Sequence, residues 1–492
     1  MITSMIENVF LLISNPVIMF GMFMGVTGGI IVGALPGLTA TMAIAILVGL
    51  TYGLSPELTF GIILSVYVGA IYGGSLSAIL LNIPGTAAAA STALDGYPMA
   101  MKGKANYAIG ISRVASFIGT LFGLIILLAI APILANISLL IRSIDMALLA
   151  LFGVLLAGFI SSEGLKIKGW ISAFIGMLIS LTGIDFLHGY PRFTFDQPFL
   201  MGGFAFAPIM IGVFGIAQVI DNISAPKARR VKQIGSIFPD FFEVVKYLPL
   251  SIRSGVIGTG VGIIPGSGED MGGWFSYLAA KFTSKNKGQF GKGSIEGVIS
   301  SETGNNASIG GALIPLLTLS LPGSAPAAVL LGAILHQGII PGPMLMTTSP
   351  DFLPMFGGIL FVACCLLLVS GIIVAKYVVQ ALDIPSRILM PLVAVFCVVG
   401  SYAINIRIFD VYVMLAFGLI FYVFHKQKYP MAPLVLGVIL GPVIDENFRR
   451  AFWINGDFMS FFSRPLPLAL GSLIFLMIWL QIGWLKKWFK NN

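Results

Sequence analysis

The sequence predicts an all-α polytopic membrane protein with two inverted structural repeats and roughly 10–14 membrane segments. The first observation is composition: of 492 residues, 57% are apolar and only 10% are charged, with a mean hydropathy of +0.98. Soluble domains carry about 25% charged residues, so this chain has too little charge to cover a soluble protein. The second is a set of long apolar runs, including 117–131, 353–375 and 465–485. The third is a set of Pro-Gly motifs that recurs in both halves of the chain.

The basic residues fall in short blocks between the apolar runs, and no Lys or Arg precedes Lys102. Under the positive-inside rule we expect these blocks to be cytoplasmic. They are Lys102/Lys104, Lys166/Lys168, Lys227 to Lys232 with Lys246, Lys281 to Lys292, Lys426/Lys428 and Lys486 to Lys490. The loops expected on the opposite side are those near Arg142, Arg192, Arg407 and 449–464. Residues 1–8 contain no basic residue, so we expect the first apolar segment to be retained and not cleaved as a signal peptide.

Two short motifs occur once in each half of the chain, in the same order. Gly33-Ala-Leu-Pro-Gly37 recurs as Gly262-Ile-Ile-Pro-Gly266, and Leu81-Asn-Ile-Pro-Gly-Thr-Ala87 recurs as Leu319-Ser-Leu-Pro-Gly-Ser-Ala325. The midpoint of the chain falls in a basic stretch. We therefore expect a first membrane repeat at 1–226, a basic cytoplasmic linker at 227–246 and a second membrane repeat at 247–492.

The flanks of the first motif pair predict that the two repeats are inverted. Basic residues on both sides of Pro265 place its flanks on the cytoplasmic face, so the apolar segment between them enters and returns as a re-entrant hairpin. The flanks of Pro36 carry no Lys or Arg, so the equivalent hairpin opens from the other face. The alternative is that each Pro-Gly pair simply kinks a spanning helix.

A Pro-Gly pair inside an apolar segment leaves backbone groups without helical partners. In lipid such breaks persist only where protein or a watery cavity satisfies these groups, and in transporters they mark the binding site. The free N–H groups of the helix that follows each break suit an anion such as a carboxylate. The predicted substrate-binding residues are Gly37, Thr39, Asn82, Gly85, Thr86, Gly266, Ser267, Gly323 and Ser324. The alternative for each Ser and Thr is a capping or helix-packing role.

The stretch 300–308 is unusually polar for a segment that leads directly into an apolar run. Glu302, Asn305 and Asn306 are candidates to ligate a coupling Na⁺ or to relay a proton, because intramembrane acids are functional candidates by default. The alternative is that Glu302 is a loop residue in contact with water at the cytoplasmic mouth. We expect Asp95 to cap a turn at the interface. The role of Glu269 and Asp270, which follow the third Pro-Gly pair, stays open.

No motif for catalysis or nucleotide binding is visible in the sequence. Without a nucleotide motif the energy source is expected to be an ion gradient, and neither an enzymatic activity nor a cofactor is predicted. The basic residues do not form an amphipathic face, which argues against nucleic acid as a partner. Cys364, Cys365 and Cys397 all lie in apolar runs without metal-ligand spacing and are expected to be small core residues.

With these motifs the chain resembles the large membrane subunit of the tripartite tricarboxylate transporter family over nearly its whole length. The resemblance is carried by Gly33-Ala-Leu-Pro-Gly-Leu38, Tyr72-Gly-Gly-Ser75, Leu81-Asn-Ile-Pro-Gly-Thr86, Thr92-Ala-Leu-Asp-Gly-Tyr-Pro-Met99, Phe290-Gly-Lys-Gly-Ser-Ile-Glu-Gly-Val298 and Gly310-Gly-Ala-Leu-Ile-Pro315. Two positions depart from the family pattern. Thr39-Ala-Thr41 replaces the more usual Gly-Pro-Thr, and Gly268-Glu-Asp270 replaces small neutral residues.

The resemblance implies a multi-pass protein of the bacterial inner membrane that works with a small membrane subunit and a periplasmic solute-binding protein. It implies uptake of small organic carboxylates of the tricarboxylate and dicarboxylate class, driven by a Na⁺ or H⁺ gradient. The mechanism expected from broken segments in two inverted halves is alternating access around one midplane site. Two alternatives stay open: a stand-alone ion channel or cation antiporter, and an intramembrane enzyme.

Overall fold

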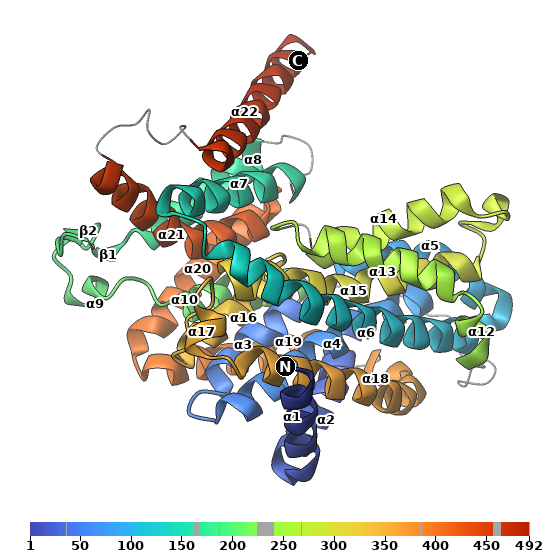
Figure 1. Ribbon diagram of the computed structural model, residues 1–492. Helices are drawn as coiled ribbons and strands as arrows, with labels where there is room; N and C mark the ends of the chain where they lie inside the picture. The colour runs from blue at the N-terminus through green and yellow to red at the C-terminus, as the bar shows by residue number, and fades with distance from the viewer. Residues whose placement is uncertain are drawn as a thin grey trace.

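The computed structural model describes residues 1–491 except 36, 162–166, 186, 224–240, 267, 383–385 and 456–463. The structure is 82% helical, so the predicted all-α class is confirmed. Within the described part of the chain the strands form a single two-stranded antiparallel sheet, in which Gly183 pairs with Arg192. Figure 1 shows β1, β2 and α9 at one end of the molecule, α12 and α14 at the other, and α22 projecting away from the remaining helices.

The described elements up to residue 223 comprise α-helices, the short 3₁₀ or π-helical turns η1 to η3, and the two strands. They are α1 (Ile2–Ser14), α2 (Pro16–Ala34), α3 (Ala40–Leu50), α4 (Pro56–Leu81), η1 (Ala87–Ala89), α5 (Ala90–Met99), η2 (Ala100–Lys104), α6 (Ala105–Ser138), α7 (Ser143–Ser161), α8 (Ile167–Ser180), β1 (Gly183–Ile184), β2 (Pro191–Arg192), α9 (Pro198–Met201), α10 (Phe206–Met210), η3 (Ile211–Ile216) and α11 (Ala217–Asn222).

The described elements after residue 240 are helical. They are α12 (Phe241–Val245), α13 (Leu248–Gly262), α14 (Gly268–Thr283), η4 (Lys287–Gln289), α15 (Ile295–Leu319), α16 (Ala325–His336), α17 (Leu345–Thr348), α18 (Phe352–Leu382), α19 (Ser386–Asn405), α20 (Ile408–Lys426), α21 (Met431–Asn455) and α22 (Pro465–Asn491). Of the predicted linker 227–246, residues 227–240 lie outside the described residues, and the division into domains stays a prediction.

Among the described residues eight helical segments are long and apolar enough to cross a bilayer. Six further apolar helices of 10–17 residues are too short to do so alone, and they include α3 and α16, which follow Pro-Gly breaks. Helix α15 is 25 residues long but too polar to be recognised as a span by composition, since it carries the stretch 300–308. The protein is therefore a multi-pass membrane protein, as predicted.

Helices α2 and α4 pack along each other in the same direction. Glycines spaced four apart on α2 face residues spaced four apart on α4: Gly25 faces Ile62, Gly29 faces Val66 and Gly33 faces Ala70. A Cβ at the last of these glycines would lie 2.1 Å from the Ala70 carbonyl oxygen, so only glycine permits this contact. Because α2 and α4 run the same way, α3 must return the chain between them.

Helices α13, α14 and α15 repeat this arrangement. Gly258 and Gly262 of α13 approach Gly304 and Ser308 of α15 in the same order, so α13 and α15 also run in one direction, and α14 returns the chain. A Cβ at Gly258 would lie 2.0 Å from the Gly304 carbonyl oxygen. Helices α2–α4 thus form one group and α13–α15 a second, and each group consists of two parallel helices joined through a broken hairpin.

The two groups run in opposite directions. Helix α4 runs parallel to α18, α18 runs antiparallel to α6, and α6 runs parallel to α15. The contacts that show this are Phe60 with Phe356, Tyr72 and Arg113 with Gly371, Leu128 with Gly357, Gly119 with Thr303 and Gly123 with Ala307. This is the relation that an inverted repeat requires. The placement of the hairpins in a bilayer stays a prediction.

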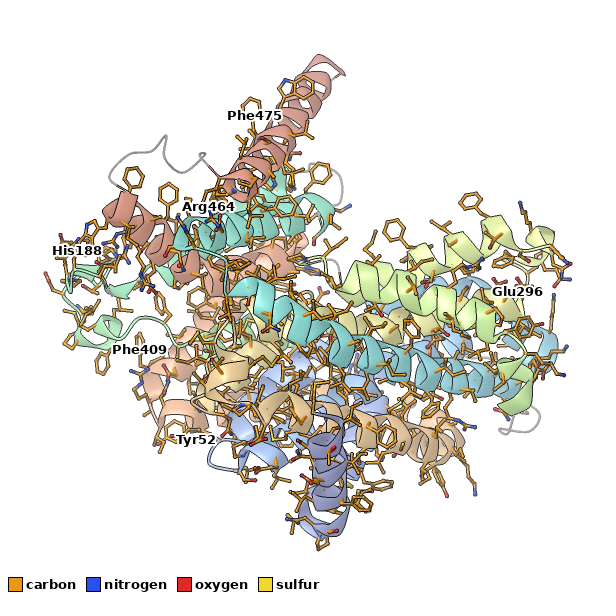
Figure 2. The ribbon with its side chains drawn as sticks, in the orientation of Figure 1. Tyr52, His188, Glu296, Phe409, Arg464 and Phe475 are labelled. Carbon is orange, nitrogen blue, oxygen red and sulfur yellow. The ribbon has the colours of Figure 1, made fainter. Side chains whose placement is uncertain are left out.

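The polar contacts of the loops agree with the sides that the charge pattern assigns. Each joins two groups that were predicted on the same face: Lys102 Nζ with the Lys292 carbonyl (2.6 Å), Lys168 Nζ with the Gln427 carbonyl (2.6 Å), Arg464 with Asp145 (2.7 Å) and Arg449 with Asp185 (2.6 Å). Figure 2 shows Glu296, near the first of these contacts, at the end of the molecule opposite His188.

Candidate functional site

The four Pro-Gly breaks meet in two pairs. A Cβ on Gly85, in the second break, would lie 1.9 Å from the carbonyl oxygen of Gly33, at the end of α2. In the other group the Gly323 carbonyl accepts hydrogen bonds from the N–H groups of Gly266 (2.9 Å) and Gly268 (3.1 Å). The first and second breaks are therefore in direct contact, as are the third and fourth.

Helices α4 and α15 end in the same way before their breaks. Their C-caps, Asn82 and Ser320, both adopt the left-handed conformation, with φ of 56° and 58°. The residues that follow lead back to the start of a new helix, at Thr86 in the first half and Ser324 in the second. The sequence repeat thus corresponds to a repeat of backbone conformation.

A cavity of about 560 Å³ brings three of the breaks together. Its lining includes Thr39 from the first break, Thr86 from the second, and Ala325 and Pro326 directly after the fourth. The third break lies behind the fourth, through its bonds to Gly323. The rest of the lining comes from η3, α11, the end of α20, residues 428–432 around the start of α21, and single residues of α4 and α7.

Two helices begin at this cavity, and each is capped by a hydroxyl. Thr39 accepts the Met42 N–H (3.1 Å) at the start of α3, and Ser324 accepts the Ala327 N–H (3.3 Å) at the start of α16. Ser324 also bonds the hydroxyl of Tyr67 on α4 (2.9 Å), so the two halves meet at this point. Helix N-termini attract anions, because their free N–H groups carry partial positive charge.

The mouth of the cavity is basic. His425, Lys426 and Lys428 line it together with Asp221 and Gln218. Lys426 Nζ lies 2.7 Å from a carboxylate oxygen of Asp221, so that acid is already paired. The cavity therefore combines two helix N-termini with two lysines set against a single acid, Asp221, and it suits a small anion better than a cation.

The remaining predicted substrate residues lie around the cavity, not in its lining. The Gly37 carbonyl accepts from Asn222 (3.3 Å), Gly85 is buried, and Gly266 contacts Ala157 of α7. Asn82 is exposed at the end of α4. Their part in binding stays a prediction. Ser267 lies outside the described residues, and so do the side chains of Glu269 and Asp270.

Glu302 lies inside α15 and is completely buried, so it is not a residue of a wetted loop. Its carboxylate accepts hydrogen bonds from the hydroxyls of Thr92 on α5 and Ser116 on α6, the latter at 2.8 Å. Asn306 donates to the same Ser116 hydroxyl at 3.0 Å. The Glu302 carboxylate thus joins three helices.

Asn305 is also fully buried, and neither its amide nitrogen nor its amide oxygen has a hydrogen-bond partner. The Thr86 hydroxyl, which belongs to a cavity-lining residue, likewise has no partner. Buried polar groups of this kind usually bind water, an ion or a ligand. Both residues therefore stay candidates for ligand contact.

Asp95 has a structural role, in keeping with the expected cap. One carboxylate oxygen accepts the N–H groups of Gly293 and Ser294 at the start of α15, both at 2.8 Å, and the other accepts the hydroxyl of Tyr277 (2.9 Å). Asp95 thus ties α5 to α14 and α15.

Several site residues escaped prediction from the sequence. Gln218, Asp221 and Tyr67 carry no motif, and they reach the site only through the packing of helices distant in sequence. Ser116 had a detectable signal, because Ser112, Ser116 and Thr120 recur at spacing four in an otherwise apolar run.

Interrupted helices that surround a cavity with charged residues in its lining, in a multi-pass helical protein, define the class of membrane transport proteins. Within this class the chain belongs to the tripartite tricarboxylate transporter TctA family, whose family model matches residues 19–436. The predicted resemblance is thereby confirmed, and the protein is a tricarboxylate transporter subunit.

Two curated relatives come from Agrobacterium vitis. The chain is 35% identical over 462 residues to an uncharacterized 52.8 kDa protein in the TAR-I ttuC' 3' region, covering 93% of this chain and 91% of that protein. It is 38% identical over 220 residues to an uncharacterized protein in the TAR-II ttuC' 3' region, covering 44% of this chain and 90% of that protein. No solved structure matches the chain.

Proposed function

We propose that this protein translocates small organic carboxylates across the bacterial inner membrane by alternating access at the cavity between its two halves. The observation that carries the proposal is the convergence of two hydroxyl-capped helix N-termini and a basic mouth on one cavity. Carboxylates are the natural ligands of such a site, because helix N-termini and lysines both favour anions. Membership of a tricarboxylate transporter family supports the same substrate class.

The transport cycle is driven by a Na⁺ or H⁺ gradient, with substrate delivered by a periplasmic binding protein and a small membrane subunit as partner. Family membership supports the tripartite assembly. The basic residues at the cavity mouth lie on the face that the charge pattern predicts to be cytoplasmic, which supports an inward-facing state.

The test is uptake of a labelled carboxylate panel, citrate included, into proteoliposomes containing the protein and its partner subunits. Uptake is measured with and without the binding protein and an imposed Na⁺ or H⁺ gradient. Gradient-driven uptake that depends on the binding protein is expected. Ion flux that needs neither carboxylate nor binding protein would contradict the proposal and favour a channel or antiporter.

Thr86→Val tests the site itself. The Thr86 hydroxyl has no partner within the protein, so its loss costs no internal hydrogen bond. A hydrogen bond to a charged ligand is worth about 1.5–3 kcal/mol, so the Kd for the carboxylate should rise about tenfold or more. Thr318→Val is the matched control, since this buried hydroxyl bonds only its own helix at the Ile314 carbonyl. Unchanged affinity in Thr86→Val would remove Thr86 from the site.

A further inference from the structure

The buried carboxylate of Glu302 has no cationic partner. No ion pair involves it among the described residues, and it is completely buried in the helix bundle. An isolated buried carboxylate is costly, because a low-dielectric interior solvates charge poorly. A site of this kind must bind a positive charge or a proton for at least part of its working cycle.

The groups that contact Glu302 are hydroxyls. Thr92 donates to one carboxylate oxygen and Ser116 to the other, while the nearby hydroxyls of Ser75 and Ser112 bond each other. A hydroxyl both donates and accepts, so it can bond a carboxylate and, after rotation, a protonated carboxyl. The surroundings of Glu302 therefore accommodate both protonation states without any movement of the backbone.

The oxygens near Glu302 already bond one another directly. The Ser116 and Glu302 oxygens lie 2.8 Å apart in a direct hydrogen bond, and those of Ser75 and Ser112 are also 2.8 Å apart. A metal cation placed among these oxygens would have to separate them to take up several oxygen ligands. A proton needs no such space.

The other charged groups on the helices packed against Glu302 form no ion pair with its carboxylate among the described residues. On α5, both oxygens of Asp95 are engaged by Gly293, Ser294 and Tyr277 of the α14–α15 region. On α6, the buried Arg113 side chain lies against Gly371 of α18, and its Nε and Nη1 have no hydrogen-bond partner; no ion pair joins it to Glu302 among the described residues.

Building on the proposed function, we infer that Glu302 binds the coupling proton of transport, at a site separate from the carboxylate cavity. When the carboxyl is protonated, one surrounding hydroxyl accepts its O–H; when the proton leaves, the hydroxyls donate to the carboxylate. The carboxylate links α5 and α6 of the first half to α15 of the second. Protonation at this link thereby affects how the two halves are held together.

Glu302→Gln is the decisive variant, because the amide keeps the shape and cannot release a proton. The control is Glu296→Gln, the same substitution at a half-buried position of the first turn of α15. Both are compared with the wild type in proteoliposomes containing the partner subunits, with labelled citrate. Exchange is measured without any gradient, and accumulation is measured under a pH gradient in Na⁺-free buffer.

One pH unit drives about tenfold accumulation when one proton moves with each substrate. Wild type and Glu296→Gln should reach this level, whereas Glu302→Gln should exchange citrate but accumulate none. Wild-type accumulation that follows only a Na⁺ gradient, or unimpaired accumulation by Glu302→Gln, would overturn the assignment. Failure of the wild type to exchange citrate or any other carboxylate of the panel would instead contradict the proposed substrate class.

A second measurement needs no variant, in case Glu302→Gln does not fold. Citrate is added to the wild-type complex in weakly buffered detergent solution with a pH-sensitive dye. Proton uptake that saturates with citrate binding and is unchanged by added Na⁺ supports proton coupling. Citrate binding with no proton uptake at any pH between about 5 and 8 would contradict it.

Discussion

Replacing Asp95 by alanine should destabilise the contact between the two halves more than most substitutions of a single polar residue. The change leaves two backbone N–H groups and the Tyr277 hydroxyl without their acceptor; Ser294 and Tyr277 are buried and Gly293 is half-buried. Each lost partner costs about 1–3 kcal/mol, so the loss of three is expected to cost about 3–9 kcal/mol. Asp95→Asn should cost about 1–2 kcal/mol, because its amide oxygen still accepts and the Tyr277 hydroxyl can accept from the amide nitrogen.

The assay is unfolding of the purified protein in mixed micelles with increasing fractions of denaturing detergent. Glu296→Ala provides a reference for loss of a carboxylate at the same helix end, where the interaction with the helix dipole is worth less than about 1 kcal/mol. The expected order of stability is wild type, Asp95→Asn and then Asp95→Ala. An Asp95→Ala protein within about 0.5 kcal/mol of the wild type would refute this account of the hydrogen bonds.

Two further predictions concern packing and charge. Gly258→Leu should abolish the close contact with Gly304 and give aggregated protein in size-exclusion chromatography. Gly260 on the same helix has open space around it, so Gly260→Ala should stay monodisperse. Equal behaviour of the two variants would contradict this account of the helix packing. The hydrogen bond from Arg449 holds the pKa of Asp185 well below its usual range. The contribution of Asp185 to stability is therefore fully present above the pKa of this residue in the unfolded chain, about 3.9, and is lost as the pH falls through its lower pKa in the folded protein. The stability difference between wild type and Asp185→Asn should then shrink on acidification below about pH 4. A difference that grew on acidification would contradict this sign.

The candidate site was only partly predictable from the sequence. Thr39, Thr86 and Ser324 were identified because each follows a Pro-Gly break, and a broken helix in an apolar segment requires polar surroundings. Lys426 and Asp221 were not, because each lies at the end of an unremarkable apolar helix. Glu302 was identified as an acid in a polar stretch, but its hydroxyl partners on α5 and α6 lie 210 and 186 residues away in sequence.

The sequence by itself determined the membrane class, the helical fold, the family and the positions of the four breaks. These follow from local properties: apolar composition, the spacing of basic blocks, and the inability of proline and glycine to continue a helix. The tertiary structure alone decided which breaks meet, that Ser324 contacts Tyr67, and that Glu302 is enclosed by hydroxyls without a cation. Such contacts depend on how helices pack, and in this protein the packing is set by glycines such as Gly33 and Gly258, whose partners no local pattern reveals.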